Sequence, residues 1–266
     1  MHVIGFCRFS YPAYGGFKQM HETIAEREAF LYAPERMEGR FRHFEALTLP
    51  SIRAQTDPDF TFLIQVGESL PAPYRARLDD LTASVPQVRI LAQPPMKHRE
   101  AAQLAILTEV DRVETETIQF RLDDDDAVGV DFVAQCRRLA RQTERLRRRA
   151  RFFALEFNHG YSVECSSEGI KAEKVTPPFW ACGLAMITRP GERRTIMNYG
   201  HHKLHHEMPM IVQPKPDMFL RANHDTNDSA AKIKYHGLKP LDDEMRAHFK
   251  ARFNVDEAAV AALFRA

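Results

Sequence analysis

Short apolar runs alternate with amphipathic segments through the first half of the chain. The strand-like runs are 2–9, 59–67, 87–93 and 117–122. The segments with apolar residues at helical spacing are 40–55, 73–83 and 99–112. This alternation predicts a mostly parallel sheet with helices on both faces.

The second half of the chain is less regular. Its predicted elements are a helix at 131–149, a strand at 151–157, a hairpin within 160–175, strands at 179–188 and 218–222, and two short terminal helices. No internal repeat or low-complexity linker divides the chain. We therefore expect one mixed α/β domain over residues 1–240 and a C-terminal helical appendage at 241–266.

The composition fits a protein with a sizeable core and no strong charge bias. The chain has 266 residues, 44% of them hydrophobic, and a formal net charge of +1. Any preference for nucleic acid or membranes therefore needs a local patch. The four cysteines form no C-x-x-C pair, which argues against a zinc ribbon or a disulfide scaffold. Because the start lacks a basic leader and no run of about 18 apolar residues occurs, we expect a cytoplasmic protein.

Four consecutive aspartates, residues 123–126, follow the strand-like run at 117–122. In extended backbone, Asp123 and Asp125 point to one side of the chain, while Asp124 and Asp126 point to the other. Two carboxylates about 7 Å apart repel by roughly 2 kcal/mol at an effective dielectric of about 20, and a divalent cation would offset this cost. In α/β sheets ligands bind at the carboxyl ends of strands, where these aspartates are expected.

Other acidic patterns fit the run less well. An aspartyl-phosphate enzyme needs Asp-x-Asp-x-Thr, but Ala127 and Val128 stand where the threonine is required. An EF-hand needs spaced acids with a glycine and a final glutamate in fixed places, which this run does not supply. A solvated turn that caps the next helix accounts for one or two of the aspartates, but not for all four.

Four segments carry a resemblance to a known family. They are "SIRAQTDPDFTFLIQVG" at 51–67, "RLDDDDAV" at 121–128, "FWACGLAMIT" at 179–188 and "HDTNDS" at 224–229. With them, the chain resembles the bacterial putative rhamnosyltransferases, which are nucleotide-sugar glycosyltransferases of the A-type fold with a D-x-D motif. The resemblance implies that residues 1–128 bind the nucleotide sugar and the metal and residues 129–240 bind the acceptor. It also implies transfer of a sugar, rhamnose by the family name, to a glycan or lipid-linked acceptor.

The resemblance further implies a divalent metal at the aspartates. Oxygen ligands favour Mn²⁺ or Mg²⁺ over zinc, and such a cation neutralises charge on a leaving nucleoside diphosphate. The implied ligands are Asp123, Asp125 and, from the late loop, His224. Asp123 would also contact the nucleotide ribose, and Asp124 would orient the donor.

Further substrate contacts are expected from strand ends and loops. Arg8 and Ser10 close the first strand, where the nucleotide base would lie. Arg99 matches an arginine that related enzymes place near the donor, and its planar fork suits phosphate or sugar hydroxyls. Gly183 would let a sugar approach the backbone, and Asn227 can hold a hydroxyl.

An inverting transfer needs a carboxylate that takes the acceptor's hydroxyl proton. The resembled fold places it after the strand at 179–188, where Glu192 and Glu207 are the candidate acids. Glu192 has two arginines beside it, which would lower its pKa and weaken it as a base. We therefore assign this catalytic role to Glu207, with Asp225 as the next candidate.

The segment 137–151 contains eight arginines. Apolar residues at helical spacing, Leu146 among them, would pack one face of this helix inward and leave the arginines on the other. That face is either simply solvated or a foothold on anionic lipid at the inner membrane face, which would suit a lipid-linked acceptor. Nucleic-acid binding would need interleaved aromatic residues, which the segment lacks.

Two other functions stay open at this point. One is nucleotidyl or phosphoryl transfer, which also uses acidic residues and nucleotides. The other is a carbohydrate- or metal-binding module without catalysis. A Gly-rich loop of the G-x-x-x-x-G-K-[ST] type does not occur, which disfavours a nucleoside triphosphatase.

Overall fold

The structure is a computed structural model that describes residues 1–15, 21–224 and 237–265. Within these residues, the main sheet has seven strands in the order β10-β6-β9-β4-β1-β2-β3. All neighbours are parallel except β9, which runs antiparallel to β4 and β6. The strands are β1 (His2–Arg8), β2 (Phe60–Gly67), β3 (Val88–Gln93), β4 (Thr117–Arg121), β6 (Phe152–Glu156), β9 (Leu184–Thr188) and β10 (Met210–Val212). The predicted mostly parallel sheet is confirmed.

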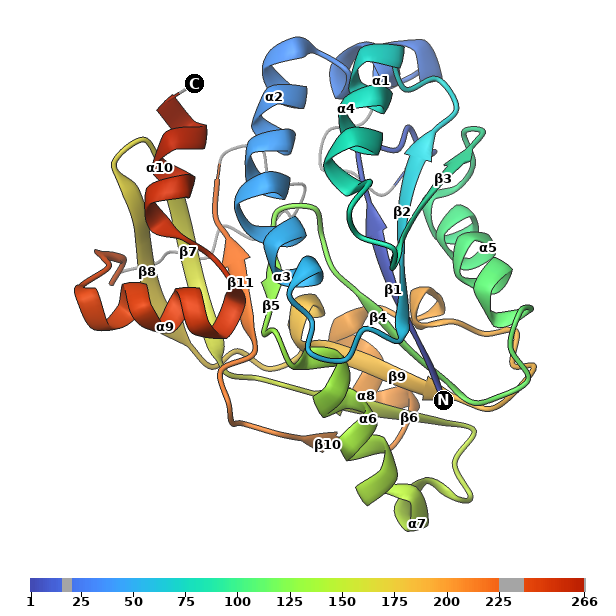
Figure 1. The fold of residues 1–266 in the computed structure, drawn as a ribbon. Coiled ribbons are helices and arrows are strands. Elements are labelled where there is room, and N and C mark those ends of the chain that lie inside the picture. The colour runs from blue at the N-terminus through green and yellow to red at the C-terminus, as the bar shows by residue number, and fades with distance from the viewer. Residues whose placement is uncertain (16–20, 225–236, 266) are drawn as a thin grey trace.

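Helices cover both faces of this sheet (Figure 1). Alternate side chains of β2 separate the two cores: Phe62 packs with α2, α4 and α6, whereas Leu63 packs with α5 and α8. The helices of the first half and of this region are α1 (Ile24–Leu31), α2 (Pro34–His43), α3 (Leu49–Arg53), α4 (Ala72–Thr82), α5 (His98–Val110), α6 (Phe132–Gln142), α7 (Glu144–Arg147) and α8 (Leu204–Glu207). This α/β arrangement agrees with the predicted fold class.

The helix predicted at 40–55 begins earlier than expected. Helix α2 continues through the π-helical segment η1 (Phe44–Thr48) into α3, so the helical stretch starts at Pro34. Proline fits a first turn because its fixed φ is helical and its missing N–H has no partner there anyway. The hydrophobic pattern missed these turns because Arg36 and Arg40 are buried. Charged residues stand where an inward face normally carries apolar ones.

A second, smaller sheet stands beside the first. Its order is β12-β8-β7-β11-β5, and only β7 and β11 are parallel neighbours. The strands are β5 (Ala127–Val128), β7 (Gly160–Ser166), β8 (Gly169–Val175), β11 (Phe219–Ala222) and β12 (Lys239–Pro240). The hairpin predicted within 160–175 is therefore present. This mostly antiparallel sheet was not predicted, because β5 and β12 are too short to show a strand pattern.

Two C-terminal helices cover the small sheet, as Figure 1 shows. They are α9 (Asp243–Phe253) and α10 (Glu257–Arg265), and the side chains of Phe249, Phe253 and Val260 join Tyr161 and Val163 in one core cluster. The predicted helical appendage thus packs on the sheet. Its boundary at residue 240 stays a prediction.

The helix predicted at 131–149 is wrong in its second half. Helix α6 ends at Gln142, where Thr143 leaves helical geometry and its hydroxyl donates to the carbonyl of Leu139 at 2.7 Å. The short helix α7 follows. Because the helix turns at Thr143, Leu146 does not pack inward and is 71% exposed. Periodicity alone could not show this change of direction.

The strand predicted at 179–188 is shorter than expected. Only Leu184–Thr188 forms β9, after a 3₁₀ turn, η2 (Ala181–Gly183). Phe179 has a positive φ of 59°, which is incompatible with a strand.

The four cysteines are all unpaired, as expected. Among the described residues, no helix is long and apolar enough to cross a membrane.

Candidate functional site

The four aspartates lie where the two sheets meet. Leu122 extends β4 through a hydrogen bond to the carbonyl of Phe6 at 3.0 Å, and β5 begins directly after Asp126. Between them the chain turns, with the Asp126 N–H bonded to the Asp123 carbonyl at 3.2 Å. The Thr48 hydroxyl, at the end of η1, donates to the Asp126 carbonyl at 2.8 Å. The aspartates are thus fixed in a turn at the carboxyl end of the main sheet.

This turn brings three carboxylates together. One side-chain oxygen each from Asp123, Asp125 and Asp126 lies within 4.8 Å of the others. Asp123 is exposed, whereas Asp125 and Asp126 are 4% and 5% exposed. Three carboxylate oxygens at such spacing, one of them on an exposed residue, fit a hard cation. The predicted metal and its ligands Asp123, Asp125 and His224 stay predictions.

Arg40 of α2 neutralises part of the buried charge. Its Nε donates to Asp124 Oδ2 at 3.0 Å and its Nη1 donates to Asp125 Oδ2 at 3.1 Å, while Nη2 also contacts Asp124. Asp124 is 1% exposed and carries this ion pair, so its predicted contact with the donor stays a prediction. A guanidinium fork bridging two carboxylates fixes both their position and their charge.

A histidine pair completes the buried side of the site. His224 Nε2 lies 2.9 Å from Asp125 Oδ2, and the His224 ring stacks on His43 with centroids 4.1 Å apart. Burial, reinforced by His224, lowers the pKa of His43 to about 4, so His43 is neutral near pH 7. Its Nδ1 then donates to the Gly39 carbonyl at 2.8 Å. His224 thus lies beside the aspartates, and its role as a metal ligand stays a prediction.

The surroundings shift the pKa values of the two buried carboxylates Asp125 and Asp126 in opposite directions. Burial alone would raise the pKa of Asp125, but Arg40 and His224 outweigh burial and hold this pKa well below its ordinary value. Burial and the charges of Asp125 and Asp123 instead raise the pKa of Asp126 well above its ordinary value. Asp126 Oδ1 also accepts the Ala222 N–H at 3.0 Å. A group of carboxylates in which one resists ionisation is chemically suited to a cation.

A basic group lies beside the aspartates at the same edge of the sheet. Arg8 ends β1, Arg121 ends β4, and His98 and Arg99 begin α5. These side chains are close enough that burial and then the charges of Arg8, Arg99 and Arg121 lower the pKa of His98. The Nε of Arg121 is buried without a hydrogen-bond partner in the described part of the chain. Such a basic group next to the carboxylates suits a bound diphosphate.

The remaining predicted residues have mixed surroundings. Ser10 is buried at a φ of 46° and its hydroxyl accepts from Arg36 Nη1 at 3.4 Å. Gly183 approaches the Phe157 carbonyl so closely that an added Cβ would lie 2.1 Å from it, which gives a packing reason for glycine. Glu207 is exposed at the end of α8. Its catalytic role, like the substrate contacts of Ser10 and Gly183, stays a prediction.

Asp225 and Asn227 lie outside the described residues, so their predicted roles stay predictions as well. Beyond Arg40 and His43, the sequence reasoning also missed Glu156. This carboxyl ends β6 at the same sheet edge, is 2% exposed, accepts the N–H of Phe179 and has a pKa raised by burial. A lone acid at a strand end gave no signal in the sequence.

His201 is a second residue that sequence reasoning missed in this region. Its Nδ1 lies 2.5 Å from the Phe179 carbonyl, and because a carbonyl only accepts, Nδ1 carries the proton. Burial and then the charge of Arg121 lower the pKa of His201. The neutral ring therefore has Nε2 as a hydrogen-bond acceptor near the basic group.

The comparison with protein families decides the assignment. The family described as "Putative rhamnosyl transferase" matches residues 2–236. The chain belongs to this family. The resemblance to this family is therefore confirmed. No curated protein matches the chain.

Solved structures similar to this chain include TarS from S. aureus. The TarS 1–349 structure in complex with UDP-GlcNAc has a TM-score of 0.48 and 8% identity, and the match covers 88% of this chain and 62% of that chain. The TarS 1–349 structure in complex with UDP has a TM-score of 0.47 and 8% identity, with 84% and 61% covered. The chain thus spans less than two thirds of these TarS chains.

Proposed function

We propose that this protein is a glycosyltransferase that moves a sugar from a nucleotide-sugar donor to a saccharide or lipid-linked acceptor, and that it uses Mn²⁺ or Mg²⁺. The supporting observation is the carboxylate group of Asp123, Asp125 and Asp126, whose oxygens lie within 4.8 Å of one another at the carboxyl end of β4. The family description makes rhamnose the first sugar to test. TarS has been solved in complex with UDP and with UDP-GlcNAc, so uridine nucleotides belong among the donors to test.

The cation would be held by Asp123 and Asp125, with His224 as a further ligand. Asp125 Oδ2 is already shared by Arg40 and His224, which leaves Oδ1 for the cation. His224 would exchange its hydrogen bond to Asp125 for the cation. When bound, a divalent cation neutralises the charge that develops on the leaving diphosphate.

The protein's own side chains would do the remaining work. Arg8 and Arg99 would bind the diphosphate, and Asp124 would keep the Asp run in place through Arg40. As the bond between the anomeric carbon and the diphosphate breaks, the acceptor oxygen bonds to that carbon. The hydroxyl proton passes to a base, for which Glu207 and Asp225 are the proposed residues.

A thermal-shift panel tests donor and metal together. We expect nucleoside diphosphates to raise the melting temperature only when Mn²⁺ is present, because the cation would link the negatively charged diphosphate to the carboxylates. At about 100 times Kd, binding stabilises by about 2.7 kcal/mol, which corresponds to a shift of roughly 5–10 °C for a chain of this size. EDTA should reverse the shift. Stabilisation by triphosphates alone would instead favour nucleotidyl transfer.

Glu207→Gln tests the proposed base. We expect kcat to fall about a hundred-fold or more with donor affinity unchanged, because loss of a base affects the chemical step. Glu192→Gln is the matched control, since Arg151 Nε lies 2.6 Å from the Glu192 carboxylate and that acid is already paired. Near wild-type turnover of Glu207→Gln would eliminate this residue and direct attention to Asp225, Glu156 or His201.

A further inference from the structure

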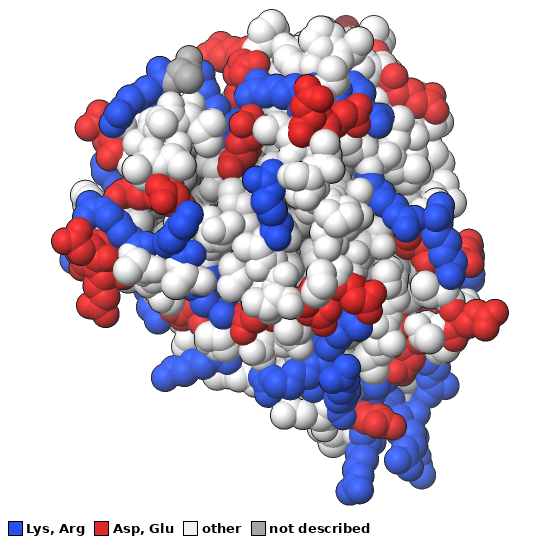
Figure 2. Space-filling view, in the orientation of Figure 1, with Lys and Arg blue, Asp and Glu red and all other residues white. Residues whose placement is uncertain are grey.

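An arginine-rich surface lies at the opposite end of the main sheet from the aspartates. Figure 1 places α7 at the lower end of the molecule, and Figure 2 shows Lys and Arg side chains gathered there. Glu116, which precedes β4, pairs with Arg147 of α7, whereas Asp123 follows the other end of β4. The surface is therefore separate from the donor site.

Some arginines in this region have structural partners. Arg137 pairs with Asp57 at 3.1 Å and with Asp59 at 2.9 Å. Arg147 is 9% exposed, and its Nε donates to the Ala140 carbonyl at 3.0 Å. These two arginines hold α6 and α7 on the sheet. Their charges are neutralised by acidic residues of the protein itself.

Other arginines in the same region are exposed and have no ion pair with any described residue. Those on α6, on α7 or directly after α7 are Arg138, Arg141, Arg145, Arg148 and Arg149. Together with Leu146 they are called the arginine face here. Five unpaired positive charges so close together repel one another, and this repulsion is relieved by an anionic partner.

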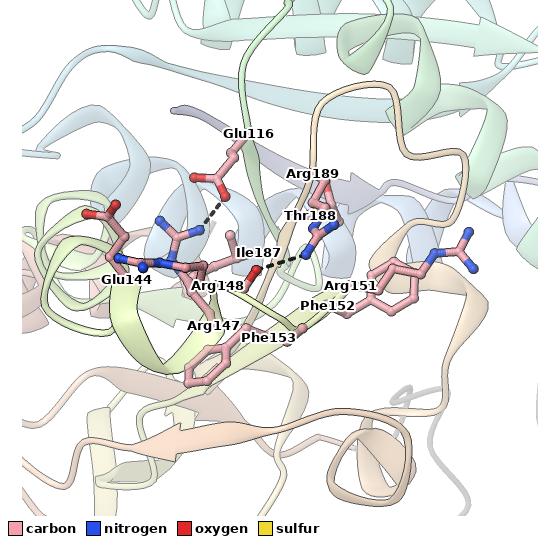
Figure 3. Close-up of a pocket in the computed structure, with 11 residues that line it drawn as sticks. Glu116, Glu144, Arg147, Arg148, Arg151, Phe152, Phe153, Ile187, Thr188 and Arg189 are labelled. Atoms are coloured by element: carbon pink, nitrogen blue, oxygen red, sulfur yellow. Dashed lines mark hydrogen bonds and ion pairs between the residues drawn. The ribbon is translucent and has the colours of Figure 1, made fainter.

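A cavity of about 320 Å³ opens beside the arginine face. Its lining includes Arg147, Arg148, Arg151 and Arg189, and Figure 3 shows Arg147 directed to Glu116 and Arg189 to the Arg148 carbonyl. This volume is at the lower end of the usual range of ligand sites, roughly 300–1,000 Å³. Arg147 and Arg151 are already paired with Glu116 and Glu192. The guanidinium groups of Arg148 and Arg189 are the ones that suit a phosphate group there.

Leu146 indicates which anionic partner fits. It is 71% exposed, more than any other large hydrophobic side chain in the described residues, and it lies between Arg145 and Arg147 on α7. An exposed leucine among arginines gives no benefit in water and adds nothing to a contact with nucleic acid. The same combination is typical of segments that lie on membranes, where the cations contact head groups and the apolar side chain enters the bilayer.

We propose that the arginine face binds the surface of a bilayer that contains anionic phospholipids, with lipid phosphates entering the adjacent cavity. Each arginine near such a surface strengthens binding by about five-fold at physiological ionic strength. Nucleic acid fits less well, because Phe152 and Phe153, the aromatic residues that line the cavity, are buried and offer no ring on which bases could stack.

Vesicle flotation of the full chain tests this proposal without any substrate. The wild-type protein should float with phosphatidylcholine vesicles that contain phosphatidylglycerol, but not with phosphatidylcholine alone. Arg145→Gln, Arg148→Gln and Arg149→Gln combined should weaken binding about a hundred-fold. Leu146→Ser should weaken it several-fold with the charges intact. Unchanged melting temperatures would show that the variants are folded.

A matched control removes the same charge elsewhere. The control combines Lys171→Gln, Lys215→Gln and Lys239→Gln, which change exposed residues outside the arginine face. We expect its vesicle binding to stay within about two-fold of wild type, because electrostatic attraction to the lipid surface falls off within a Debye length. Equal vesicle binding by the arginine variant and the wild type would overturn the proposal. So would tighter binding to a DNA duplex than to the anionic vesicles. Sugar transfer to a soluble acceptor should be unaffected by the arginine variant, so this test and that of the proposed function fail separately.

Discussion

Asp125→Asn is expected to lower sugar transfer by about 10²–10³-fold or more and to remove the Mn²⁺ dependence of nucleotide binding. Asparagine keeps the shape of the side chain but lacks the charge that would hold the cation. The fold should remain, because Arg40 keeps its ion pair with Asp124 and a neutral amide at this buried position repels neither Asp123 nor Asp126. The effect should therefore be on chemistry and metal binding, with little on stability.

Transfer assays and nucleotide-binding titrations at several Mn²⁺ concentrations measure this effect. Asp80→Asn is a suitable control because it removes one carboxylate from an exposed position on α4. Wild-type activity of Asp125→Asn would remove Asp125 from the metal site. Lost activity with unchanged Mn²⁺-dependent nucleotide binding would contradict its role as a ligand but leave it important for transfer.

Arg40→Leu is expected to be the most destabilising substitution at the site. It leaves Asp124 and Asp125, which are 1% and 4% exposed, without the guanidinium that bridges them. Removing one partner of a buried ion pair costs about 3–5 kcal/mol. For a chain of this size, the melting temperature should fall by roughly 10 °C.

Urea denaturation of the metal-free protein gives the free energy of unfolding directly. Arg42→Leu is the matched control, because Arg42 lies on the same helix with partial exposure and has no ion pair with a described residue. Adding Asp124→Asn to Arg40→Leu should recover part of the loss, since one buried charge is then removed. If Arg40→Leu lowers the free energy of unfolding no more than Arg42→Leu does, Arg40 does not neutralise the buried aspartates.

The strands of the parallel core were predicted to within one residue because their signals are local. The run at 59–67 is β2 at Phe60–Gly67, and the run at 117–122 is β4 at Thr117–Arg121. Each is a short apolar segment bounded by polar residues, so neighbouring residues decide its conformation. The break at Thr143 had no such signal, because a threonine hydroxyl that bonds back to a carbonyl is compatible with either outcome.

The site was only partly predictable for a physical reason. The aspartates drew attention because adjacent like charges need an explanation, and the family resemblance added His224. Arg40 gave no signal, because an arginine in a polar helical segment is normally solvated. The ion-pair partners of Arg40 lie more than eighty positions away in the sequence, and the Asp125–His224 contact joins residues 99 apart. The Asp125–His224 contact follows from the pairing of β5 with β11, which no local pattern encodes.

The position of β4 has a consequence for the acceptor. One end of this strand leads to the aspartates and the other to Glu116 and the arginine face. Five residues of strand extend for about 17 Å. An enzyme held on a bilayer by its arginine face would thus carry out transfer well above the head groups. A sugar attached directly to a lipid would not reach that height, whereas the outer end of a longer glycan would. The distance between the arginine face and the aspartates would therefore select acceptors by their length.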